Sequence, residues 1–217
     1  KSENDIQTPS NSSLYQDACH IIDQAQQFAY HAVNEMLIKR NWLLGMRIQH
    51  EVLKEERAEY GEQTIKKLAK VLTEKYGRGF KKSNLYSFVS FYQNHQDFFQ
   101  PLTGKSLDMA DDNIFQSLTG KSPIRLSWTH YSIILQELNA EGRSWYEQEA
   151  ANEMWSTRTL QRNISSQYYH RLLQSQDKAV VHNEMVKSTK PLQDKLEYLK
   201  NPVVAEFLGF KNNTDYT

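Results

Sequence analysis

The chain of 217 residues is 39% apolar, which suffices for one globular domain with a buried core, or for two small ones, and excludes an intrinsically disordered protein. Lysine plus arginine and aspartate plus glutamate each number 26, so the net charge gives no reason to expect a polyanionic partner, which must be inferred from local clusters. One cysteine, a polar amino terminus and no run near the roughly 20 apolar residues that cross a bilayer predict a soluble, cytoplasmic protein without disulfide or membrane contact.

A long first helix is predicted after a polar tail, residues 1–13, that we expect to be disordered. Ser13 is a suitable cap, and the apolar pattern continues to about Leu53, with a bend allowed near Asn41 or Gly45. Cys19 is interpreted as a small core residue rather than a nucleophile. We expect the residues that recur every three or four positions to face the core: Ala18, Ile21, Ile22, Ala25, Phe28, Ala29, Ala32, Met36 and Leu37.

A second helix is predicted from Tyr60 to Lys75 and a third from Ser83, joined by the stretch YGRGF. Gly77 or Gly79 can end the second helix, because glycine adopts the left-handed conformation without steric cost. Ser83 is a candidate cap for the third helix. A short glycine-containing turn between two helices is typical of a helix-turn-helix unit, which presents the start of its second helix outward.

Positive charge is concentrated on this first unit. Between Tyr60 and Ser90, six lysines and one arginine give seven cations against Glu62 and Glu74: Lys66, Lys67, Lys70, Lys75, Arg78, Lys81 and Lys82. Cations beside the free N–H groups of a helix start favour phosphate binding. We predict that DNA phosphates contact Lys66, Lys70, Arg78, Lys81 and Lys82, and that hydrogen bonds to bases or backbone come from Ser83, Asn84 and Tyr86. The alternative is that these charges are only solvated helix faces.

The helical periodicity is lost between Gln100 and Arg125, where the string LTGKS occurs twice, and we interpret this segment as a loop or insertion. A P-loop requires a further glycine five residues before the one in GKS, where this sequence has Phe99 and Phe115. We therefore expect no nucleotide site and no small-molecule substrate.

Three more helices are predicted in LSWTHYSIILQEL, EGRSWYEQEAANEM and STRTLQRNISSQYYHRLL, with Ser127 and Ser156 as caps. The last two form a second helix-turn-helix-like unit. We predict weaker DNA contacts from Thr157, Arg158 and Arg162, because the acidic helix before them offsets or pairs with the arginines. Core packing is the interpretation for the aromatic residues and for the histidine of SWTHY: Trp128, His130, Tyr131, Trp145, Tyr146 and Trp155.

The remainder of the chain is predicted to leave this helical domain, residues 14–173. Residues 174–200 are polar and interrupted by Pro191, which indicates a linker helix. The apolar cluster in NPVVAEFLGF then indicates that residues 201–217 begin a further domain.

Three ordered blocks of the sequence resemble a known family. They are ERAEYGEQTIKKLAKVLTEKYGRGFKKSNLYSFVSFYQ, LSWTHYSIIL and WSTRTLQRNISSQYYHRL, within a span from about Ile21 to Leu173. They resemble the N-terminal domain, formerly of unknown function, of bacterial YhcG-type proteins, in which it precedes a PD-(D/E)XK nuclease domain. The resemblance implies a helical module that binds or targets DNA for a nuclease. NPVVAEFLGF also resembles the start of that nuclease domain, whereas the insertion around Asp108 to Phe115 is longer than expected for the family.

The catalytic half of such a nuclease is not found in this chain. A PD-(D/E)XK site needs acidic ligands for a divalent cation and a lysine two residues after an acidic one. No lysine here has an acidic residue two positions before it, and the seven histidines show neither cysteine partners nor HExxH spacing. We expect no catalytic site and no cofactor in this chain, with Mg²⁺ or a similar ion needed only by the nuclease domain. The alternative function is a protein-interaction or dimerisation module, in which the long first helix forms a homodimer or binds a partner subunit.

Overall fold

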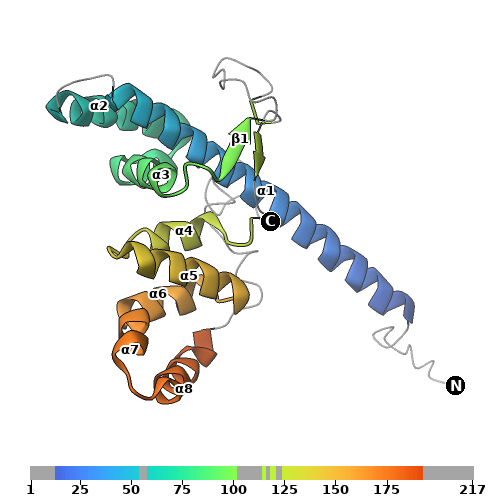
Figure 1. Ribbon diagram of the computed structural model, residues 1–217. Helices are drawn as coiled ribbons and strands as arrows, with labels where there is room; N and C mark the ends of the chain where they lie inside the picture. Colours follow the sequence, from blue (N-terminus) through green and yellow to red (C-terminus); the bar gives the residue numbers. More distant parts are fainter. Residues whose placement is uncertain (1–12, 54–57, 102–113, 116–117, 121–123, 193–217) are drawn as a thin grey trace, which may run out of the picture.

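The computed structural model describes residues 13–53, 58–101, 114–115, 118–120 and 124–192, and it confirms an all-α fold (Figure 1). The predicted tail, most of the insertion and the predicted start of a further domain lie outside the described residues. The helices are α1 (Ser13–Leu53), α2 (Ala58–Tyr76), α3 (Lys82–Asn94), α4 (Trp128–Ile134), α5 (Ala140–Asn152), α6 (Thr157–Ser165), α7 (Tyr168–Gln174) and α8 (Lys178–Thr189). Two 3-10 turns, η2 (Arg78–Phe80) and η3 (Lys190–Leu192), precede α3 and follow α8.

The ends of the predicted insertion are paired, which corrects its interpretation as a loop. Strand β1 (Phe99–Pro101) is antiparallel to β2 (Leu118–Gly120), with Phe99 opposite Gly120 and Pro101 opposite Leu118. The Phe99 side chain is buried, and its ring lies edge-on to Trp42 at 5.6 Å between centroids. Burial of this one aromatic residue therefore anchors the pair of strands to α1.

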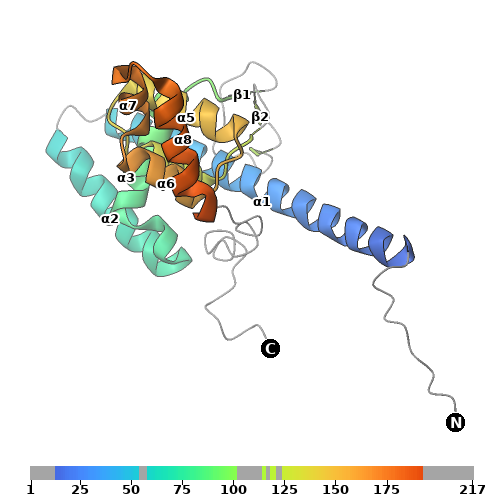
Figure 2. The same cartoon turned by 90° about the horizontal axis from the view of Figure 1, so that it is seen from below.

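Helix α1 has two halves with different environments. It is continuous over 41 residues, through both positions where a bend was allowed. From Asn34 onward it is largely buried, whereas Ile21, Ile22 and Phe28 are 67%, 55% and 79% exposed. Figures 1 and 2 show the first half extending away from the other helices. The prediction that Ala18 to Ala32 face the core of this chain is therefore wrong, because no other described element reaches them; Cys19 is only half-buried.

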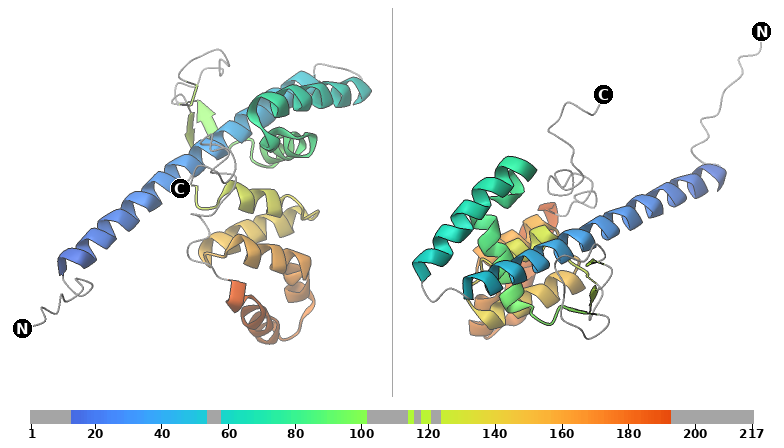
Figure 3. Two further views of the ribbon diagram at one scale, coloured as in Figure 1. Left: turned by 180° about the vertical axis from the view of Figure 1, so that it is seen from behind. Right: turned by 90° about the horizontal axis from the view of Figure 1, so that it is seen from above.

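The core forms where the second half of α1 meets α3 (Figure 3). Ile38, Trp42 and Met46 of α1 are buried together with the apolar face of α3, namely Leu85, Phe88 and Phe91. Gly45 makes the close approach feasible, since a Cβ at this position would lie 2.1 Å from the carbonyl oxygen of Phe88. Trp128 of α4 completes the cluster, with its ring 5.3 Å from that of Phe88 and 5.4 Å from that of Phe91.

Asn34 fixes the position of α4 against α1. Its side-chain amide donates to the Leu126 carbonyl at 3.0 Å and its oxygen accepts from the Trp128 N–H at 3.2 Å. Ser127 caps α4 as predicted, because it accepts from the His130 N–H, and the His130 ring in turn accepts from the Ser127 N–H. The other ring nitrogen of His130 lies 2.9 Å from the Trp155 carbonyl, so this histidine has the predicted packing and hydrogen-bonding role.

A buried hydroxyl ties together α5, α6 and α7. Tyr146 is fully buried; its hydroxyl donates to the Asn163 carbonyl at 3.1 Å and accepts from the Tyr169 N–H at 3.0 Å. Burial raises the pKa of this phenol to about 12. Gln167, which precedes α7, forms no side-chain cap. The Tyr146 hydroxyl of α5 instead accepts from an N–H group in the first turn of α7. Helix α8, in the predicted linker, buries Val181 and Met185.

We predict that Gly45→Ala lowers stability although alanine is the better helix former. The added methyl group meets the Phe88 backbone, and overpacking of this kind costs about 1–3 kcal/mol. Gly61→Ala is the matched control: its Cβ would meet only the Val52 side chain, at 2.9 Å, and alanine adds about 1 kcal/mol of helix preference. Urea unfolding of both variants checks this, and equal stability of the two would contradict it.

Candidate nucleic-acid interface

The connection between α2 and α3 has a defined geometry. Gly77 ends α2 as predicted, with a φ of 99° and an N–H that donates to the Thr73 carbonyl at 3.0 Å. The turn η2 follows, and Lys81 occupies the cap position of α3 without a side-chain cap hydrogen bond. The prediction of Ser83 as the cap is therefore wrong. Because the 3-10 turn ends at Phe80, α3 begins at Lys82, and Ser83 lies within the first turn of the helix.

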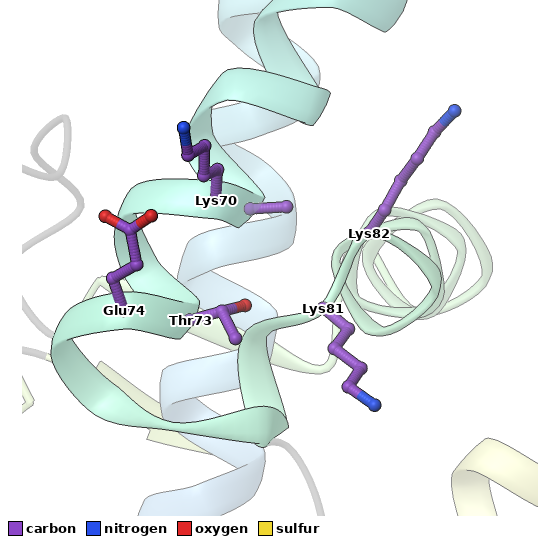
Figure 4. A pocket seen from close by; sticks show the side chains of 6 residues that line it. Lys70, Thr73, Glu74, Lys81 and Lys82 are labelled. Carbon is purple, nitrogen blue, oxygen red and sulfur yellow. The ribbon is translucent and has the colours of Figure 1, made fainter.

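A shallow hollow lies between the end of α2 and the start of α3 (Figure 4). It is lined by Ala69, Lys70, Thr73, Glu74, Lys81 and Lys82. Figure 4 shows the side chains of Lys81 and Lys82 diverging from the start of α3. The hollow therefore carries three lysines and one glutamate, brought together from both helices of the unit.

Lys82 differs from the other predicted contact residues because it has an ionic partner. Its ammonium lies 2.7 Å from the Glu62 carboxylate and 5.7 Å from the centre of the Tyr86 ring. The hydrogen bond and charge of Lys82 hold the pKa of the Glu62 carboxyl below its usual value. Sequence reasoning missed this pair because the two residues belong to different helices, and no local pattern brings them together.

Several exposed cations of the unit form no ion pair with a described residue, although the charge of Lys66 also helps to lower the pKa of the Glu62 carboxyl. Among the described residues, no ion pair involves the exposed side chains of Lys66, Lys67, Lys70, Arg78 and Lys81. Surface ion pairs contribute little to stability in any case. Within the described part of the chain, ion pairing therefore does not explain why these cations are grouped.

The predicted polar contacts of the first unit differ in their surroundings. Ser83 is exposed, and Tyr86 is 41% exposed beneath the Lys82 side chain. Asn84 is half-buried and donates to the Gly79 carbonyl at 3.0 Å. The Asn84 side chain therefore closes the turn, whereas Ser83 and Tyr86 remain open to a ligand.

The second unit has the predicted cap, but the single helix predicted from Ser156 to Leu173 is divided into α6 and α7 because Gln167 between them is left-handed, with a φ of 53°. Ser156 accepts from the Thr159 N–H at 3.1 Å and donates to the Leu192 carbonyl at 2.8 Å, so the start of α6 is linked to the end of η3. Thr157 is half-buried, and Arg158 and Arg162 are exposed. Within the described part of the chain neither arginine forms an ion pair with α5, where Glu147 instead lies 3.0 Å from His95. The expected pairing of these arginines with the acidic helix is thus not seen.

These features define a predominantly helical domain with a group of exposed lysine and arginine side chains. The described residues contain no group of histidine, cysteine, aspartate or glutamate side chains that could hold a metal ion. They also contain no helix that is long and apolar enough to cross a membrane.

Residues 17–171 match the model of the DUF1016 N-terminal domain, and the chain belongs to this family. It is 31% identical, over 221 residues, to the protein of Escherichia coli (strain K12) named "Putative nuclease YhcG". The match covers 94% of this chain and 58% of that relative, so the chain spans little more than half of the relative's length. The YhcG-type resemblance is therefore confirmed. No solved structure matches the chain.

We predict that Asn84→Ala destabilises the protein, because it removes the hydrogen bond that closes the turn after α2. The expected loss is about 1 kcal/mol. Ser83→Ala is the matched control, since Ser83 neither caps α3 nor is buried. Thermal or urea unfolding measures both, and a Ser83 variant that lost as much stability as the Asn84 variant would contradict the assignment.

Proposed function

We propose that this domain binds duplex DNA mainly through phosphates and directs a PD-(D/E)XK nuclease domain to its substrate in the cytoplasm. The observation that carries the proposal is the group of exposed cations on α2, on η2 and at the cap of α3 that form no ion pair among the described residues. These cations are concentrated on one unit although the chain as a whole has no net charge. The E. coli relative supports a connection with nucleases by its name.

The roles of the residues follow from their positions. Lys66, Lys70, Arg78 and Lys81 are the principal phosphate contacts, since each is exposed and none forms an ion pair among the described residues. Lys82 is a conditional contact, because a phosphate has to compete with Glu62 for its ammonium. Ser83 and Tyr86 lie beside the N–H groups at the start of α3, where hydrogen bonds to the DNA backbone or bases would add to the ionic contacts.

The second unit contributes less in this proposal. Arg158 and Arg162 lie one turn apart on the exposed side of α6, and Thr157 is at its first position. The acidic residues of α5 lower the local potential even without direct pairing, because salt screens a surface charge only over a Debye length of about 10 Å at 0.1 M. Reversing both arginines is therefore expected to weaken DNA binding less than reversing the cations of the first unit.

We predict that the triple variant Lys70→Glu, Arg78→Glu and Lys81→Glu binds all DNA sequences more weakly. Each phosphate contact releases condensed counterions, so log affinity falls against log salt with a slope of about −0.9 per contact. Loss of all three contacts makes this slope shallower by about 3. Titration of labelled duplex at two or more salt concentrations measures both effects.

The matched control reverses Lys178, Lys187 and Lys190, which are exposed on α8 and η3, at the far end of the molecule from α2 in Figure 1. It changes the net charge equally, so it separates local contacts from the long-range field. The DNA proposal fails if the folded triple variant of the first unit binds with the affinity and salt slope of this control.

The chain alone is expected to have no nuclease activity, because it lacks the acidic and lysine pattern of the catalytic site. Supercoiled plasmid incubated with the purified chain and Mg²⁺ or Mn²⁺ should remain intact. Nicking that co-purifies with the chain through successive columns would refute this.

Self-association is a second proposed function, favoured by a separate observation. The first half of α1 exposes Leu14, Ile21 and Phe28 by 77%, 67% and 79%. Exposed apolar side chains in a continuous row are typical of interaction sites. This function does not depend on DNA binding, since the first half of α1 and the basic unit are different surfaces.

A further inference from the structure

The N-terminal rod, residues 13–32 of α1, carries two interleaved rows of apolar residues. Leu14, Ile21 and Phe28 recur every seven positions and are exposed. Ala18, Ala25 and Ala32 also recur every seven positions, four residues after each large residue, and are exposed as well. A seven-residue apolar repeat on a helix is typical of a coiled coil, which buries the seam between two helices.

We propose that two copies of this chain pair through their N-terminal rods as antiparallel helices, with the two-fold axis at the level of Asp23. In this register Leu14 faces Ala32 of the second copy, Ala18 faces Phe28, and Ile21 faces Ala25. Each layer then joins one large residue to one alanine. The same arrangement is generated from both ends, as a symmetric dimer requires.

The alternation of sizes favours the antiparallel orientation. In a parallel pair with the same seam, identical residues would share a layer, so layers of two large residues would alternate with layers of two alanines. Two helices cannot approach to one distance along such a seam without leaving voids at the alanines or overlap at the large residues. The antiparallel register keeps the side-chain volume of every layer similar.

Residues beside the seam fit the same register. Tyr15 lies opposite Ala29 of the second copy, and Ile22 lies opposite its own equivalent near the axis. On the other side, the Asp17 carboxylate lies opposite the His31 imidazole, which can donate a hydrogen bond to it. The flanking positions thus place no like charges opposite one another.

The shape of the protomer allows this pairing. In Figures 1 and 3 the helices other than α1 all lie toward one end of α1, and the rod extends from them. An antiparallel pair places the two sets of helices at opposite ends of the paired rods. A parallel pair would bring them side by side, where their surfaces would have to fit as well.

This inference rests on the proposed self-association and is independent of DNA binding. Its first test is sedimentation equilibrium of the chain and of Ala25→Leu. The variant adds apolar surface but overfills the layers that join residues 21 and 25, so dimerisation should weaken about tenfold or more. Adding Ile21→Ala to Ala25→Leu restores one large and one small residue per layer, and should recover the parent affinity.

Gln27→Leu is the matched control, because it adds the same side chain at an exposed position outside the seam. It should leave the dimer unchanged. If Ala25→Leu instead strengthens association, the apolar rod is a nonspecific or parallel surface and the proposed register is wrong. If the parent chain is a monomer at high concentration, self-association itself fails.

The second test measures the orientation directly. A spin label is attached at Arg47→Cys, an exposed site on α1, in a Cys19→Ser background. With a rise of 1.5 Å per residue, the antiparallel register places the two labels about 72 Å apart along the axis. A parallel pair would place them within roughly 20–30 Å, since packed helices lie 8–10 Å apart. A dimer with the short distance would overturn the antiparallel inference while leaving self-association intact.

Discussion

The backbone contact between α1 and α3 is the constraint on which the rest of the structure depends. Because Gly45 has no side chain, the Phe88 carbonyl can approach α1 more closely than any Cβ would permit. This proximity lets Leu85, Phe88 and Phe91 fill the surface of α1 beside Trp42. It also holds α3, and with it the cations at its start, close against α1.

Single glycine and serine residues predicted the helix ends whose geometry depends only on neighbouring residues. Gly77 ends α2 because only a residue tolerant of positive φ suits that position, and Ser127 and Ser156 cap their helices because their hydroxyls reach the N–H three residues on. Ser83 resembled a cap equally well in sequence. Ser83 is not the cap, because the 3-10 turn at Arg78–Phe80 leads directly into α3 and places the cap two residues earlier, at Lys81.

Features decided by tertiary contacts were not predictable in the same way. Periodicity shows that one side of α1 is apolar, yet it cannot tell whether another segment covers that side, so the stripe from Ala18 to Ala32 was assigned to a core it does not join. The pairing of Lys82 with Glu62 likewise depends on the angle between two helices. For the candidate site, the sequence shows that cations are concentrated on this unit, but it does not show that Lys82 pairs with Glu62 while the other predicted contacts form no ion pair among the described residues.

The hydroxyl of Ser156 gives the second unit a mechanical connection to the chain that follows it. The same oxygen that accepts from the Thr159 N–H donates its proton to the carbonyl of Leu192, where the described part of the chain ends. If η3 moved away from α6, the Ser156 hydroxyl would lose one of its hydrogen-bond partners. The position of Leu192 and the cap of α6 are therefore coupled through a single oxygen atom.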